Sequence, residues 1–134
     1  MKSISKLKKE LDKWFSLFIR LRDADENGIV ICFTSGRAYH YKNIHAGHFI
    51  SRKRLSTRFC EVNVQPQSAA DNIFGQGEQY TFGKELDYKY GKGTAEELHI
   101  KSLRTLKISR SDYEEKISYY KTAVDKLKKE KGIE

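Results

Sequence analysis

The first apolar pattern along the chain is helical. Between residues 5 and 22 the large apolar side chains recur at intervals of three and four residues, at Leu7, Leu11, Trp14, Phe15, Phe18 and Ile19. This spacing places them on one face of an α-helix. The polar run Asp23–Asn27 and Gly28 come next, and such residues are typical of a helix end and a turn. We therefore expect an N-terminal helix over about residues 5–22.

The next apolar segments are too short for helices and predict strands. Residues 29–33 form a run rich in β-branched side chains. A turn at 34–37 separates them from a second expected strand at 39–45, which ends in a histidine. Residues 62–67 should be extended, because the residue before Pro66 is biased away from the helical region.

Glycines and capping patterns divide the remainder into helices. A helix is expected from Ser68, which opens with two alanines and is interrupted by Gly75 and Gly77. A second should cover residues 79–90. Two patterns of the capping-box type, Thr94–Glu97 and Ser111–Glu114, predict helices that run to about residues 103 and 131.

The last of these helices carries one narrow apolar seam. Its members follow a four-three-four-three spacing: Tyr113, Ile117, Tyr120, Val124 and Leu127. The seam either packs on the protein's own core or joins two copies of the chain in a homodimer. The pattern alone leaves both interpretations open, with the first favoured.

Charge adds a preference for an anionic partner. The 134 residues include 26 Lys and Arg against 18 Asp and Glu, which gives a formal net charge of +8. A nucleic acid is the natural partner for such a surplus, and the alternative is a basic protein without a polyanion partner. Cys32 and Cys60 are too few for a disulfide framework. No apolar run is long enough for a bilayer and no secretory signal is evident, so we expect a cytoplasmic protein without a membrane partner.

Candidate chemistry gathers between residues 45 and 72. Two imidazoles, two amides and a carboxylate fall in this window: His45, His48, Asn63, Asp71 and Asn72. Four cations lie among them: Arg52, Lys53, Arg54 and Arg58. Metal-assisted cleavage of a phosphodiester needs this mixture. A neutral imidazole takes a proton from water, a hard cation stabilises the leaving oxygen, and cationic side chains hold the phosphates. Those four cations could also form an ordinary solvated loop.

These segments resemble a known family of phage proteins. The matching stretches are Cys32-Phe-Thr-Ser35-Gly36, His45-Ala-Gly-His48-Phe49, residues 58–72, Tyr80 and Lys89-Tyr90-Gly91. Over roughly residues 15–125 they resemble the NinG/Rap family of lambda-like phages, which is linked to recombination through endonucleolytic cleavage of branched DNA. The order of elements also resembles the ββα-metal (HNH) nuclease motif. The resemblance implies an α+β fold in one domain over residues 1–134. A small ββα-metal core at about 29–75 would be flanked by the N-terminal helix and by a C-terminal helical part at about 79–131.

The resemblance also implies roles for two residues. His48 matches the general-base histidine, and Asn63 matches the central asparagine that ties the loop together and helps to hold that base. Many HNH enzymes have a metal ligand directly before the base, but Gly47 stands there in this chain. His45 is the nearest substitute, although strict strand geometry would place it on the opposite face. It could bind the metal, orient the site or bind phosphate.

The expected metal is Mg²⁺ or Mn²⁺. Asn72 matches a metal-ligating asparagine of HNH resolvases, and an amide oxygen with waters suits these ions. Asp71 adds a carboxylate beside it. Neighbouring helical residues diverge by about 100°, so a regular helix would not let Asp71 and Asn72 serve one ion, and Asp71 could instead occupy only an old zinc-ligand position.

A structural zinc is not expected. Related sequences carry two Cys-x-x-Cys knuckles, whereas this chain has Cys32, Ser35, Ser68 and Asp71 at those positions. One thiolate, two hydroxyls and one carboxylate make a poor zinc site. Hydrogen bonds or apolar packing would have to join the two turns.

Together these features favour a metal-dependent endonuclease that cuts branched recombination intermediates, a Holliday junction or a D-loop, in the cytoplasm of the bacterial host. The first alternative is a non-catalytic DNA-binding accessory protein with a decayed nuclease site. A module that binds an acidic protein and a nuclease that cuts linear duplex are the others. A homodimer through the last helix would suit a two-fold junction.

Overall fold

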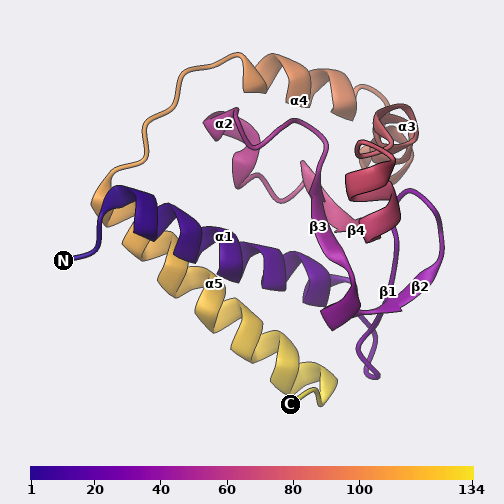
Figure 1. Ribbon diagram of the computed structural model, residues 1–134, viewed down its shortest axis with the longest axis horizontal. Coiled ribbons are helices and arrows are strands. Elements are labelled where there is room, and N and C mark those ends of the chain that lie inside the picture. The colour runs from indigo at the N-terminus through magenta and orange to yellow at the C-terminus, as the bar shows by residue number, and fades with distance from the viewer.

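Two long helices that run in parallel form one side of the molecule (Figure 1). The computed structural model describes residues 1–134 and has α1 at Ile4–Arg22 and α5 at Arg110–Lys131. Their first turns meet where Arg110 donates to the backbone oxygen of Lys2, and their last turns meet where Lys131 donates to the backbone oxygen of Arg22. The expected helix at 5–22 is confirmed, and the side chain of Ser3 caps its first turn.

The strands form two separate hairpins between these helices and the rest of the chain. β1 (Ile29–Ile31) pairs antiparallel with β2 (Ala38–His40), and β3 (His45–His48) pairs antiparallel with β4 (Val64–Gln67). The fold is therefore α+β, as the sequence predicts. The short elements η1 (Tyr41–Asn43), α2 (Leu55–Arg58) and η2 (Ala70–Phe74) lie before β3, between the strands of the second hairpin, and after it.

One expected strand is wrong. Residues 39–45 do not form a single strand, because the chain turns at η1 and enters the other hairpin at His45. The Tyr41 side chain is buried in the core and the backbone N–H of Lys42 donates to the His40 ring. Burial of the Tyr41 ring fixes the turn at Tyr41–Asn43. A prediction from the alternation of apolar and polar residues alone takes these residues as extended.

The C-terminal helices follow the expected order, with different caps. α3 (Gln79–Tyr90) confirms the predicted bounds, and α4 spans Thr94–Ser102. Neither predicted capping box forms. Gly93 precedes α4, while the box before α5 is made by Ser109 and Asp112. Ser109 lies two residues before the predicted serine, so α5 begins two residues earlier than a cap at Ser111 indicates.

The core consists of three packed clusters. The largest joins α1, α5 and β4 and includes Leu11, Phe15, Val64, Tyr113 and Tyr120. A second surrounds the first hairpin, and a third lies between α3 and α4. The apolar seam of α5 is buried against α1 in the first two clusters, which confirms its packing on the protein's own core. This seam is not free to join two copies of the chain.

No helix has the length and apolar character required to cross a membrane.

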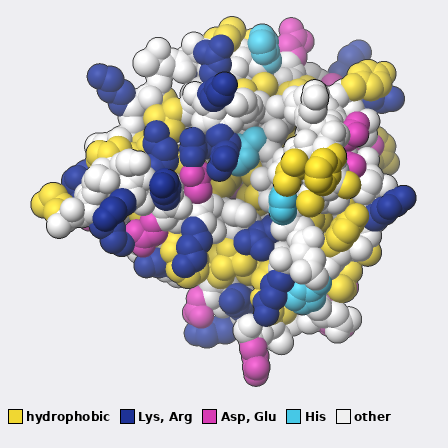
Figure 2. All heavy atoms as spheres, in the orientation of Figure 1, with side chains coloured by type: hydrophobic (Ala, Val, Ile, Leu, Met, Phe, Trp, Pro, Cys, Tyr) yellow, Lys and Arg dark blue, Asp and Glu magenta, His cyan; other side chains and the backbone are white.

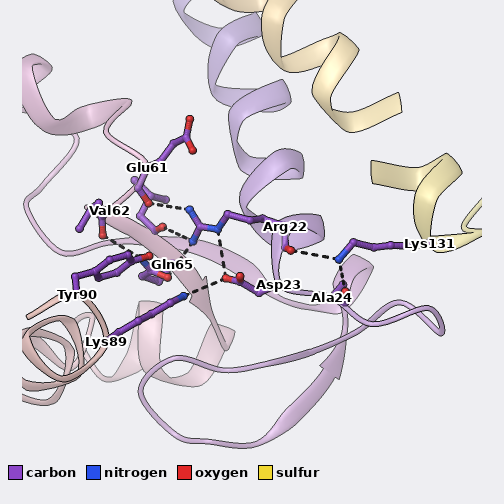
Figure 3. A network of polar contacts seen from close by, with 10 residues as sticks. Arg22, Asp23, Ala24, Glu61, Val62, Gln65, Lys89, Tyr90 and Lys131 are labelled. Carbon is purple, nitrogen blue, oxygen red and sulfur yellow. Dashed lines mark hydrogen bonds and ion pairs between the residues drawn. The ribbon is translucent and has the colours of Figure 1, made fainter. Parts of the chain in front are cut away.

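The end of α1 is tied to β4 by Arg22 (Figure 3). Its guanidinium donates to the backbone oxygen of Glu61 over 2.9 Å, to the side-chain oxygen of Gln65 over 3.0 Å and to the backbone oxygen of Val64 over 3.4 Å. Lys131 donates to the backbone oxygens of Arg22 and Ala24. A cation at a helix C-terminus is favourable. The network therefore fixes β4, and with it β3, relative to the helix pair.

We predict that Arg22→Met lowers the free energy of unfolding by about 2–3 kcal/mol, because it leaves half-buried carbonyl groups without a charged donor. Urea unfolding followed by circular dichroism measures this change. Arg37→Met is the matched control, since Arg37 is exposed and its guanidinium makes no hydrogen bond or ion pair. Equal midpoints for the two variants would contradict the structural role of Arg22.

Candidate active site

A cleft of about 620 Å³ lies between α1 and β3. His45 and His48 of β3 line this one cleft together with Arg52 and with Asn72, which comes 24 residues after His48 in the chain. Figure 2 shows a face of the molecule on which Lys and Arg side chains gather beside histidines. Both histidines reach the cleft although they are three residues apart on β3, because His45 stands at the end of the strand. The alternation expected from strand geometry therefore does not separate them.

The ring of His48 is fixed by the backbone of α2. Its Nε2 lies 2.9 Å from the backbone oxygen of Arg58. A carbonyl oxygen only accepts, so Nε2 carries the proton and Nδ1 keeps a free lone pair. Burial of the ring lowers the pKa of His48 from 6.5 to about 4, and the bond to the Arg58 carbonyl opposes this effect. The imidazole is therefore neutral at pH 7 and can accept a proton at Nδ1.

Asn63 holds the loop that follows β3. Its side-chain oxygen accepts from the backbone N–H of Ile50 over 2.8 Å, and its amide nitrogen donates to the backbone oxygens of Ile50 and Thr57, each over 3.1 Å. The residue is completely buried. Asn63 does not touch His48, but Thr57 precedes Arg58, whose carbonyl holds the histidine ring. The amide therefore acts on His48 through the backbone of α2.

Asn72 and His45 contact each other inside the cleft. The amide nitrogen of Asn72 lies 3.1 Å from Nδ1 of His45. With the amide as donor, the lone pair of Nδ1 is engaged and the side-chain oxygen of Asn72 remains open. Of these two side chains, Asn72 offers the better ligand for a hard cation, because its oxygen is free. His45 orients that oxygen through its hydrogen bond with the amide.

This donor set is sparse for a metal ion. Nowhere in residues 1–134 do three or more His, Cys, Asp or Glu side chains form a group able to hold one. Mg²⁺ commonly keeps several waters and uses substrate phosphates together with one or two protein ligands. The residues therefore fit an ion that binds together with a phosphate and not one held by a complete protein cage.

Asp71 does not point into the cleft. Its carboxylate accepts from the Thr34 hydroxyl over 2.6 Å and lies 3.9 Å from Sγ of Cys32. This contact places the Asp71 carboxylate among the degenerate knuckle residues, which is one of the two positions that the sequence leaves open for it, and its part in a metal site stays a prediction.

The four positions of the degenerate zinc knuckles are nevertheless brought together. Sγ of Cys32 accepts from the backbone N–H groups of Ser35 and Ser68, and the Ser68 hydroxyl accepts from the backbone N–H of Asp71. Hydrogen bonds therefore join the two turns, which is the role that the sequence assigns to them in place of zinc.

The four basic residues of the loop separate into two groups. Arg52, Lys53 and Arg54 are exposed, whereas Arg58 forms a double hydrogen bond with Asp12, over 3.1 and 2.5 Å. Its guanidinium also donates to the backbone oxygen of Arg52. Arg58 is thus committed to the fold, and phosphate binding stays a prediction for the three exposed residues.

Three polar residues of α1 escaped the sequence analysis. Asp12, Ser16 and Arg20 line the cleft at intervals of four residues. Arg20 donates to the backbone oxygen of Tyr41 over 2.9 Å, which fixes the turn before β3. The sequence showed these residues at helical spacing beside the apolar face of α1, but such spacing also occurs at an ordinary boundary between core and solvent.

The comparisons with known proteins point to one family. The family model described as Bacteriophage Lambda NinG protein matches residues 1–130 of the chain. Neither the curated proteins nor the solved structures contain a significant match.

We predict that Asp12→Asn lowers the free energy of unfolding by about 1.5–3 kcal/mol, the range for hydrogen bonds to charged groups. The variant leaves Arg58 without a counter-ion in a half-buried site. Asp125→Asn is the control, because its pair with Lys129 is exposed and should contribute almost nothing. Chemical denaturation measures both. Similar losses in the two variants would show that Arg58 is not held by Asp12.

We predict that His48 titrates near pH 4, and NMR of the imidazole carbons should give this midpoint. Between pH 4 and 6.5 the unfolded chain binds a proton at this residue that the folded chain does not. His48 therefore lowers the stability of the fold as the pH falls from 6.5 to 4; this loss is absent above pH 6.5 and complete below pH 4. A midpoint close to 6.5 would mean that the His48 ring is solvated and not buried as this structure has it.

Proposed function

The chain belongs to the NinG family, and we propose that it is a divalent-metal-dependent endodeoxyribonuclease acting on branched DNA, such as a Holliday junction or a D-loop. The observation that carries this proposal is the shared cleft. It combines a neutral histidine with a free Nδ1, an open amide oxygen and an exposed arginine. Few other reactions use a neutral base, a hard-ion ligand and a cation side by side.

The proposed reaction is hydrolysis of one phosphodiester bond. Nδ1 of His48 accepts a proton from a water molecule as the water oxygen bonds to phosphorus. The bond from phosphorus to the 3′ oxygen breaks, and the leaving oxygen takes a proton from solvent. A Mg²⁺ or Mn²⁺ ion held by Asn72 and His45 would supply positive charge beside the phosphate and the leaving oxygen.

The remaining residues keep these groups in line. The Arg58 carbonyl orients the His48 ring. Asn63 holds the backbone at Thr57, and Asp12 holds the side chain of Arg58. A fixed base that stays in line with the attacked phosphorus needs little rearrangement in the transition state. The negative phosphate also favours the protonated imidazole and raises the pKa of His48 when DNA is bound.

Contacts to the DNA would be made mainly through phosphates. Arg52, Lys53 and Arg54 are exposed beside the cleft, so binding should weaken steeply with salt. No helix offers an evident set of base-reading side chains, which favours recognition of DNA shape. A dimer that cuts a junction on two strands would need a surface other than the apolar seam of α5, since that seam is buried against α1.

A second candidate function is a non-catalytic DNA-binding accessory protein. It is favoured by the sparse donor set and by the absence of a free carboxylate in the cleft, since Asp12 is paired with Arg58 and Asp71 points elsewhere. Such a protein would bind branched DNA equally well with or without His48.

We predict that the wild-type protein cleaves a four-way junction and a fork faster than a matched linear duplex, with Mg²⁺ or Mn²⁺ and not with EDTA. His48→Ala should lower the single-turnover rate by about 10²–10⁴-fold, the usual contribution of a general base. His99→Ala is the matched control, because His99 is exposed on α4 and lies outside the cleft. Gel analysis of end-labelled substrates measures the cleavage rate of each of the three proteins on each of the three DNA substrates.

The alternatives give different results in the same assay. Tight binding of junctions without incision would establish the accessory protein. Equal rates for linear and branched substrates would refute recognition of branched DNA while leaving a nuclease. An unchanged rate in His48→Ala would refute the assignment of the base.

A further inference from the structure

Beside the cleft, η2 exposes two large apolar side chains. Ile73 is 56% exposed and Phe74 is 83% exposed, although their neighbour Asn72 lines the cleft. In Figure 2 hydrophobic side chains protrude beside histidines, on the face that also carries a group of Lys and Arg. Ile73 and Phe74 belong to none of the three core clusters. Within this chain Phe74 therefore gains little, and Ile73 only part, of the free energy that burial normally provides.

This exposure does not come from a loosely held turn. The backbone N–H of Gly77 donates to the Asp71 oxygen over 2.8 Å, and the buried side chain of Gln67 donates to the Gly77 oxygen over 2.8 Å. Gln76 and Glu78 are held in the left-handed region, with φ of 53° and 47°, which non-glycine residues rarely adopt. A turn fixed in this way presents its apolar side chains in one orientation and loses little entropy when a partner binds.

The cations that line the cleft favour a nucleic acid as the partner, although the exposed Glu78 also lies in this turn. Lys42 and Arg52 line the cleft next to Asn72, and the chain carries a formal charge of +8. A second copy of the chain would bring the same charge to the surface and be repelled. DNA combines a negatively charged backbone with flat apolar bases, and an apolar side chain can enter a base step once the backbone is held.

Resting on the proposed function, we propose that Ile73 and Phe74 form an apolar wedge that inserts at the branch point of the DNA. In an intact duplex, insertion must break a full base stack. At a junction or fork the stack is already interrupted, so insertion costs less there. The wedge would thus bring the branch point next to the cleft, and would give the nuclease its preference for branched substrates.

The test uses a four-way junction with 2-aminopurine at the branch point, in EDTA so that no strand is cut. Wild type should raise the fluorescence by unstacking the probe. Phe74→Ala should lose this signal and bind the junction about tenfold more weakly, with little change for linear duplex. Phe74→Trp keeps an aromatic ring and should retain both properties. Tyr88→Ala is the control, because Tyr88 is 89% exposed on α3 and lies outside the cleft.

Each outcome separates this proposal from the proposed function. If Phe74→Ala keeps the fluorescence change and the junction affinity while the wild type still cuts junctions, the wedge is refuted and the nuclease stands. If the wild type neither prefers nor cuts branched DNA, the proposed function has failed and the wedge fails with it. If Phe74→Ala instead abolishes self-association in sedimentation, the surface binds a second copy and the wedge is refuted. Unfolding midpoints check that every variant is folded.

Discussion

The pairing of β3 with β4 is the interaction on which the cleft depends. Gly47 faces Gln67 so closely that a Cβ at position 47 would lie 2.2 Å from the Gln67 side-chain oxygen. The amide of Gln67 also donates to the hydroxyl of Thr34 and to the backbone oxygen of Gly77. One buried side chain thus joins the strand that carries both histidines, the turn after β1 and the turn after Asn72. Glycine at this position permits the strand pairing and excludes the acidic residue that many HNH enzymes have there.

Helix α1 completes the cleft from the other side. Its last turn holds β4 through Arg22, and its middle holds the segment behind His48 through Asp12 and Arg58. Arg58 is therefore used to hold the segment whose carbonyl orients His48. Under the proposed function, the cations that remain exposed in the loop before α2 would follow the DNA backbone without loosening the histidine. Binding and positioning would then be divided between neighbouring basic residues.

Patterns that depend on one face of one element were predictable from the sequence. The apolar face of α1, the seam of α5 and the bounds of α3 follow from helical spacing and from the glycines beside it. The grouping of His45, His48 and Asn72 came from a family resemblance, and their chemical roles stay predictions. Features that depend on tertiary contacts were not predictable. Burial of Tyr41 ends the expected second strand. Asp12 forms an ion pair with Arg58, and the Thr34 hydroxyl donates to the Asp71 carboxylate. In both pairs the partners are far apart in the sequence.

The most direct test is a crystal structure of the His48→Ala protein with branched DNA and Mn²⁺, with anomalous diffraction to locate the ion. The account predicts one manganese peak in the cleft beside the Asn72 oxygen and a phosphate of the DNA, with the truncated side chain at position 48 facing that phosphorus. It also predicts the branch point next to η2. DNA bound across another face, or manganese away from Asn72, would contradict the assignment of this cleft as the nuclease site.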